Sequence, residues 1–87
     1  MAWRTELIGA AAKELVALDK QIGRRVVRLL RELERSGEPR RQGTALVGSQ
    51  LWRWRVGDYR IVAEIRDAEE LILVVRIAHR RDVYRDR

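Results

Sequence analysis

The sequence has no cysteine and a single histidine, His79, among its 87 residues. A chain without cysteine forms neither disulfide bonds nor thiolate metal sites. Its acidic residues, apart from the neighbours Glu69 and Glu70, are scattered singly and give no set of three or four metal ligands. The glycines lack the Lys-Ser or Lys-Thr pair of a phosphate-binding loop, and neither serine lies in a GxSxG sequence. We therefore expect a protein that uses no metal and no small-molecule cofactor.

Long hydrophobic runs are also missing. No segment approaches the ~18 to 20 apolar residues that cross a bilayer, and residues 1–15 carry charges where a signal peptide has its apolar stretch. We therefore expect a cytoplasmic protein with no membrane partner. The length suits one domain, so we expect residues 1–87 to fold as a single unit.

Negative charge is scarce as well. The formal net charge is +6 and the sequence pI is about 11.0, and every basic residue except Lys13 and Lys20 is an arginine. Guanidinium groups bind phosphate oxygens with two parallel hydrogen bonds and stay charged at any working pH. A polyanion is therefore the expected partner. Nucleic acid is favoured over a membrane because no basic amphipathic helix with an aromatic face is evident.

The first half of the chain predicts a strand followed by two helices. Residues 2–8 alternate like a short strand, with Trp3, Thr5 and Leu7 on one face. From Ala10 the spacing of apolar residues becomes helical, and two helices are expected to meet near residues 18–20, with Asp19 capping the second. The second helix should end at the SG pair before the only proline, and residues 38–48 are expected to form a loop.

The stretch LWRWRVGDYRIV, residues 51–62, predicts a β-hairpin. Gly57 and Asp58 form a two-residue loop with glycine first, which suits a type II′ turn because only glycine takes the required positive φ without strain. This turn places Arg55 opposite Arg60. Alternate side chains then form a core face with Trp52, Trp54, Val56, Tyr59, Ile61, Ala63 and Ile65, and an outer face with Arg53, Arg55, Arg60, Val62, Glu64 and Arg66.

The last strand is expected over LILVVRIAH, residues 71–79, after a turn at DAEE. Pairing Glu70 with Arg66 would place Arg76 opposite Arg60 on the outer face, with Arg80 continuing that face. The core face would then gain Leu71, Leu73, Val75 and Ile77. A register shifted by one residue would bury Arg76, which argues against it.

These elements predict an α+β fold. Their order is β-α-α-β-β-β, with a helical hairpin packed on one face of a mainly antiparallel four-stranded sheet. The other face of the sheet is expected to be basic. Arg55 opposite Arg60 costs stability in such a sheet, because like charges face each other across the strands.

The residues left for chemistry are a cationic face, His79 and two tyrosines. Metal-free cleavage of RNA needs little more, because the 2′-hydroxyl of the substrate attacks the adjacent phosphorus. The protein then positions the phosphate, stabilises its developing charge and moves two protons. Arginines suit the first two tasks and are poor at the third, since a guanidinium does not readily release a proton.

Two segments of the sequence resemble one protein family. The run LVGSQLWRWRVGDYRIVAEIRDAEELILVVRIAHRRDVYR is similar to the second half of RelE toxins of type II toxin–antitoxin systems, in the RelE/ParE superfamily, and AAKELVALDKQIGRRVVRLLREL is similar to their helical hairpin. The order and spacing of GDYRIV and AHRRDVY are the most specific features. The resemblance implies an endoribonuclease, an mRNA interferase that cuts mRNA in the A site of the 70S ribosome. It also implies a cognate RelB-like antitoxin that wraps and blocks the toxin.

The resemblance also assigns site residues. Arg60 in GDYRIV and Arg80 after His79 take the places of phosphate-binding arginines, and Tyr84 takes that of a C-terminal tyrosine proposed to stack on a base. Arg53 and Arg55 stand where well-known members often have lysines, so they suit electrostatic clamping rather than proton exchange. We expect Arg76 to join them in binding RNA.

Proton transfer is then left to His79, to Tyr84 or to a group on the ribosome. His79 has core-face parity, so a structural histidine is about as consistent with the pattern as a catalytic one. Tyr84 also has a structural alternative, packing against the helices. Trp52 and Trp54 are interpreted as core residues rather than base-stacking platforms, and the arginines of the second helix as a solvated face.

Two other functions stay open on the sequence. A ParE-like toxin would share the fold but inhibit DNA gyrase by binding, without nuclease activity. A plain basic module would bind nucleic acid without needing Tyr84. The retained Arg60, Arg80 and Tyr84 favour the RelE-like function over both.

Overall fold

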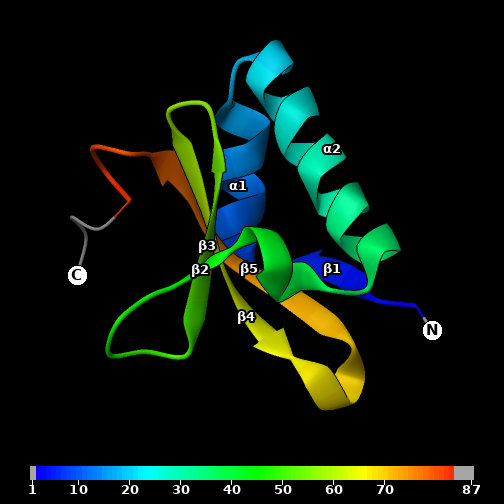
Figure 1. Cartoon of the computed structure of the whole chain (residues 1–87). Coiled ribbons are helices and arrows are strands. Elements are labelled where there is room, and N and C mark those ends of the chain that lie inside the picture. The colour runs from blue at the N-terminus through cyan, green and yellow to red at the C-terminus, as the bar shows by residue number, and fades with distance from the viewer. Residues whose placement is uncertain (1, 84–87) are drawn as a thin grey trace.

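The computed structural model describes residues 2–83, whose two helices cover one face of a five-stranded sheet (Figure 1). The strand order is β1-β5-β4-β3-β2, with β1 parallel to β5 and all other pairs antiparallel. The elements are β1 (Arg4–Leu7), α1 (Gly9–Ala17), α2 (Lys20–Ser36), η1 (Pro39–Gln42), β2 (Thr44–Ala45), β3 (Leu51–Val56), β4 (Tyr59–Arg66), η2 (Asp67–Glu69) and β5 (Leu71–His79). The expected α+β class is confirmed.

The sheet has one strand more than expected. Residues 38–48 contain the short helix η1 and the two-residue strand β2, which pairs with Arg53 and Trp52 of β3. Two residues are too few to show any periodicity, so this strand was not predictable from the sequence. The preceding helix is held by Arg40, which donates two hydrogen bonds of 2.9 and 2.8 Å to the Asp67 carboxylate. These bonds lower the pKa of Asp67.

The helices begin and end where the sequence indicated. The Asp19 carboxylate accepts a hydrogen bond of 3.1 Å from the backbone N–H of Gln21 and caps α2. At the other end Gly37 takes a left-handed conformation with φ of 71°, which a residue with a side chain rarely adopts. Between these caps α2 buries Val26, Leu30 and Leu33 against the sheet. None of the helices formed by residues 2–83 is long and apolar enough to span a bilayer.

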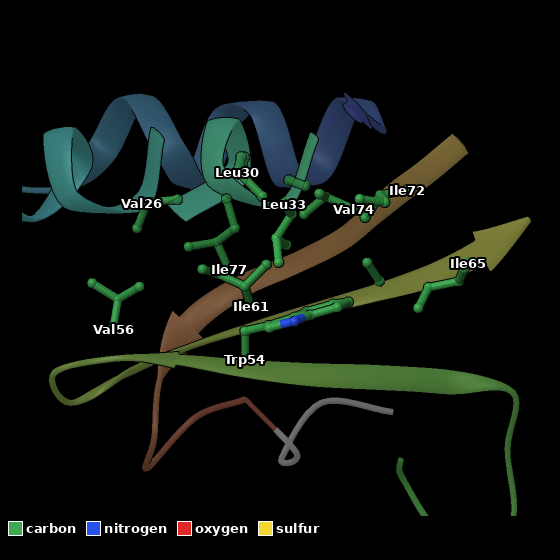
Figure 2. Close-up of a cluster of buried hydrophobic side chains, with 12 residues drawn as sticks. Val26, Leu30, Leu33, Trp54, Val56, Ile61, Ile65, Ile72, Val74 and Ile77 are labelled. Carbon is green, nitrogen blue, oxygen red and sulfur yellow. The ribbon is translucent and has the colours of Figure 1, made fainter. Parts of the chain in front are cut away.

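The core lies between the helices and the sheet, and Trp54 is its largest buried side chain (Figure 2). Its indole Nε1 donates a hydrogen bond of 3.0 Å to the carbonyl oxygen of Pro39, so burial leaves no donor unsatisfied. Gly43 lies against the same ring, and a Cβ there would come within 3.0 Å of Nε1. Trp54 therefore anchors the segment 39–43 to the core, and the core interpretation of this tryptophan is confirmed.

The β3–β4 hairpin has the predicted register. Gly57 adopts φ of 58°, and the pairs are Val56 with Tyr59, Arg55 with Arg60, Trp54 with Ile61 and Arg53 with Val62. The division into a core face and an outer face follows from this pairing.

The register expected for β5 is wrong. Leu71 rather than Glu70 pairs with Arg66, and a bulge at Val75 shifts the pairing again, so that Arg76 lies opposite Val62 and Ala78 lies opposite Arg60. Ile72 and Val74 therefore join the cluster beneath the helices before the bulge and Ile77 joins it afterwards, whereas Leu71, which is buried, and Leu73 and Val75 lie outside this cluster. Without the bulge, the shifted register would bury Arg76. The extra residue switches the face to which each later side chain points, so Arg76 is not buried.

Replacing Trp54 with Phe removes the donor to Pro39 and part of the ring that fills the space beside Gly43. We expect the free energy of unfolding, measured by urea denaturation, to fall by about 1 to 3 kcal/mol. The matched control is Trp52→Phe, because Trp52 is only half-buried and should lose less than about 1 kcal/mol. Equal losses in the two variants would show that Trp54 does not anchor this segment.

Candidate nucleic-acid interface

The hairpin places three arginines on the outer face of the sheet. Arg53 and Arg55 come from β3 and Arg60 from β4, with Arg55 directly opposite Arg60. Arg55 is exposed, whereas Arg53 and Arg60 are half-buried. Within residues 2–83 neither Arg55 nor Arg60 forms an ion pair. Two unneutralised guanidinium groups therefore share this part of the outer face.

The Arg60 guanidinium is held in place by the turn. Its Nη1 donates hydrogen bonds of 3.0 Å to the carbonyl oxygens of both Gly57 and Tyr59. The Nε and Nη2 hydrogens form no hydrogen bond within the described part of the chain. An Nε–Nη2 edge is one of the two-pronged donors with which arginine binds phosphate or carboxylate. Arg60 is therefore oriented by protein carbonyls while a bidentate edge stays available for an anion.

Arg80 is brought to the same turn by the backbone. Its N–H donates a hydrogen bond of 2.7 Å to the carbonyl oxygen of Asp58, which links the end of β5 to the β3–β4 turn. Its side-chain Nε lies 3.9 Å from Asp58 Oδ1, and both side chains are more than half exposed. An exposed pair at this distance is weak. The structure thus brings Arg80 to the turn whose carbonyls also orient Arg60.

His79 points away from these arginines. It lies opposite Tyr59 on the helix side of the sheet, and the two rings meet edge-on with their centroids 5.4 Å apart. Its Nδ1 accepts a hydrogen bond of 3.1 Å from the backbone N–H of Arg81, which leaves Nε2 as the ring nitrogen that can donate. The expected core-face parity is confirmed, and the structure does not bring His79 onto the face that holds Arg60.

Arg76 forms an ion pair with Glu14, a residue that the sequence did not indicate as part of the site. Its Nε donates a hydrogen bond of 3.1 Å to Glu14, whose other carboxylate oxygen accepts one of 2.7 Å from the N–H of Ile77. Strand β1 ends at Leu7, opposite Val74, so Glu14 of α1 takes over as the acceptor along this edge of β5. The pattern of helix-forming residues around Glu14 contains no signal for this role, because Glu14 and Arg76 are 62 residues apart in the sequence.

The outer face is not basic throughout, contrary to expectation. Val62, Ala78 and Val83 form a second buried cluster there, with Leu46, Leu51 and Val75 packed against it. The segment after β5 turns back beneath the sheet, on the side opposite the helices (Figure 2). The N–H groups of Asp82 and Val83 both donate to the carbonyl of His79 and form this turn. Tyr84, the predicted catalytic tyrosine, lies outside the described residues.

A family model described as "ParE toxin of type II toxin-antitoxin system, parDE" matches residues 6–84. The chain belongs to the RelE/ParE superfamily of toxins. This toxin is therefore part of a type II toxin–antitoxin system, as the resemblance indicated, although the matching model carries the name of the ParE branch. No curated protein gives a significant match to the chain.

Solved RelE structures share the fold of this toxin. A chain of the toxin–antitoxin complex RelBE2 from Mycobacterium tuberculosis is 26% identical with a TM-score of 0.81, over 91% of this chain and 99% of that one. A chain of the archaeal RelE–RelB complex from Pyrococcus horikoshii OT3 is 25% identical with a TM-score of 0.75, over 95% and 100%. The intact Escherichia coli RelBE complex matches in fold, at 21% identity and a TM-score of 0.78 over 90% and 96%.

Replacing Glu14 with Ala removes the acceptor for the Ile77 N–H and for one side of Arg76. We expect the free energy of unfolding to fall by about 1 to 3 kcal/mol, because these donors are partly buried. Amide hydrogen exchange at Ile77 should accelerate together with this loss.

The matched control for Glu14 is Glu6→Ala, which removes an exposed ion pair with Arg4. Such a pair contributes only about 0 to 1 kcal/mol. If Glu14→Ala costs no more stability than Glu6→Ala, Glu14 does not hold the edge of β5.

Proposed function

We propose that this toxin is an mRNA interferase that cleaves messenger RNA in the ribosomal A site without a metal. The observation that carries the proposal is the Arg55 and Arg60 pair, in which Arg60 is oriented by the carbonyls of Gly57 and Tyr59 and keeps a bidentate donor edge for an anion. Oriented donors that meet developing negative charge are the main requirement of phosphate chemistry. Arg80, linked to the same turn through Asp58, adds a third cation.

The proposed reaction is the attack of a ribose 2′-hydroxyl on the adjacent phosphorus. The 2′-oxygen forms a bond to phosphorus, the bond to the 5′-oxygen breaks, and the products carry a 2′,3′-cyclic phosphate and a 5′-hydroxyl. In this scheme Arg60 and Arg80 hold the phosphate oxygens, while Arg53 and Arg55 stabilise the charge that grows on them. Arg76 binds RNA more weakly, since Glu14 already neutralises one side of its guanidinium.

Proton transfer in this scheme is assigned to Tyr84 first and to His79 second. The 2′-hydroxyl must lose a proton and the departing 5′-oxygen must gain one. The Nδ1 of His79 is already engaged with the Arg81 N–H and its ring packs on Tyr59, which leaves only Nε2 for exchange. Val83, which precedes Tyr84 in the sequence, packs with Val62 and Ala78 in the cluster on the outer face.

The proposed partners are mRNA, the 70S ribosome and a cognate RelB-like antitoxin in the cytoplasm. Support for the antitoxin comes from the similar structures, which are toxin–antitoxin complexes. An antitoxin with acidic residues facing Arg53, Arg55 and Arg60 would neutralise them and block access of RNA.

A second candidate is supported by the family model, which bears the ParE name. On this alternative the toxin binds DNA gyrase and cleaves nothing. The arginines of the outer face would then contact a protein surface, and no step would require a bidentate phosphate contact by Arg60.

Primer extension on an mRNA translated in vitro tests the proposal. With ribosomes and toxin present we expect cuts at codon positions, and with toxin alone we expect none. Replacing Arg60 with Ala should lower the single-turnover cleavage rate by at least about a hundredfold, since an oriented charge donor is lost at the transition state.

The matched control is Arg66→Ala, because Arg66 is also a β4 residue but forms ion pairs with Glu64 and Glu69 at the far end of the strand. The Arg66→Ala variant should cleave mRNA at nearly the wild-type rate. Absence of cleavage by the wild-type toxin, together with inhibition of gyrase supercoiling, would replace the interferase proposal with the ParE-like one.

A further inference from the structure

A second cationic site lies between α2 and the β3–β4 turn. A cleft of about 200 Å³ opens there, and we call it the α2–turn cleft. Its charged lining consists of Arg25, Arg28 and Glu32 from α2 and Arg55 from β3. Gly57 closes it on the turn side.

Helical spacing brings the α2 residues of the cleft together. Arg25, Arg28 and Glu32 stand three and four positions apart, so their side chains leave the helix on one face. This face differs from the buried stripe that contains Val26 and Leu30. The sequence alone shows only an arginine-rich polar face, and the hairpin turn is what converts part of that face into a cleft.

The Arg25 guanidinium packs directly on the turn. Its Nη1 and Nη2 atoms lie 3.4 and 3.6 Å from the position that a Cβ on Gly57 would occupy. The positive φ of 58° already favours glycine at this position. Glycine therefore lets the turn bend tightly and also leaves the space in which the guanidinium sits.

The charges of the cleft are not balanced within the described protein. Three guanidinium groups face one carboxylate, and within residues 2–83 no hydrogen bond or ion pair joins the side chain of Arg25, Arg28, Arg55 or Glu32 to another residue. Clustered like charges repel one another, and a bound anion would relieve the repulsion. Guanidinium groups match the oxygens of a phosphate in charge and in geometry.

The cleft shares one residue with the candidate RNA site. Arg55 lines the cleft and is also the strand partner of Arg60 in the hairpin. We propose that the α2–turn cleft binds a backbone phosphate of the RNA strand, next to the phosphate held at Arg60. The proposal rests on the proposed function in taking RNA as the ligand, and it extends the RNA path from the sheet onto α2.

A binding experiment without ribosomes tests the cleft independently of cleavage. The probe is a fluorescent single-stranded RNA with 2′-O-methyl groups, which lacks the nucleophile and stays intact. Its affinity for the toxin is measured by anisotropy over a range of salt concentrations. For the double variant Arg25→Gln/Arg28→Gln we expect at least about tenfold weaker binding at low salt, and a salt slope reduced by about 0.7 to 1.4, because each lost phosphate contact removes about 0.7 for single strands.

The matched control is Arg24→Gln/Arg31→Gln, which removes the same charge from the same helix outside the cleft, since Arg24 and Arg31 line other surface depressions. It should weaken binding less than about threefold. A gain-of-affinity variant, Glu32→Gln, removes the one carboxylate of the cleft and should bind the probe more tightly. Because it strengthens binding, its effect is not explained by loss of folding.

The cleft proposal is overturned if Arg25→Gln/Arg28→Gln binds like wild type or if the two double variants weaken binding equally, since general charge would then explain the effect. It is also overturned if the cleft variant loses binding only to an acidic antitoxin peptide and not to the RNA. A cleft-specific loss of RNA affinity in a toxin that never cleaves mRNA would refute the interferase function and leave the cleft intact.

Discussion

The two-residue turn between β3 and β4 determines both the core packing of the hairpin and the positions of its arginines. Gly57 supplies the positive φ, and the turn fixes a register that sends Trp54 and Ile61 into the core while Arg55 meets Arg60 on the opposite face. The turn carbonyls also organise the cations around them. Gly57 and Tyr59 orient Arg60, and Asp58 receives the N–H of Arg80, so one local conformation builds both the core and the candidate site.

Local signals were enough to predict the helices and the hairpin. Asp19 and Gly37 mark the ends of α2, and Gly57 marks the turn that sets the hairpin register. The register of β5 was not predictable in the same way. Its turn uses Glu70, a residue other than glycine with a positive φ of 50°, and the run LILVVRIAH is apolar on both sides, so neither the turn nor the alternation shows the bulge at Val75.

The candidate site likewise contains some features that local sequence signals predict and others that depend on the tertiary structure. The facing of Arg55 and Arg60 follows from the hairpin alone, whereas the contact of Arg80 with the turn depends on the β5 register, which was not predicted. Glu14 and Arg25 required the tertiary structure, because each meets its neighbour across more than thirty residues of sequence. The second buried cluster, which contains Val62, Ala78 and Val83, was not predictable either, because Val83 joins it only through a turn after the last strand.

Arg55 and Arg60 face each other on the outer face at a cost in stability, and we propose that a polyanion binds them. The direct test is Arg55→Thr, measured both for unfolding in urea at low salt and for ribosome-dependent cleavage. We expect the free energy of unfolding to rise by about 0.2 to 1 kcal/mol, a gain that shrinks as salt screens the repulsion, and cleavage to slow. Lower stability with unchanged cleavage would contradict this proposal, because Arg55 would then be a structural residue.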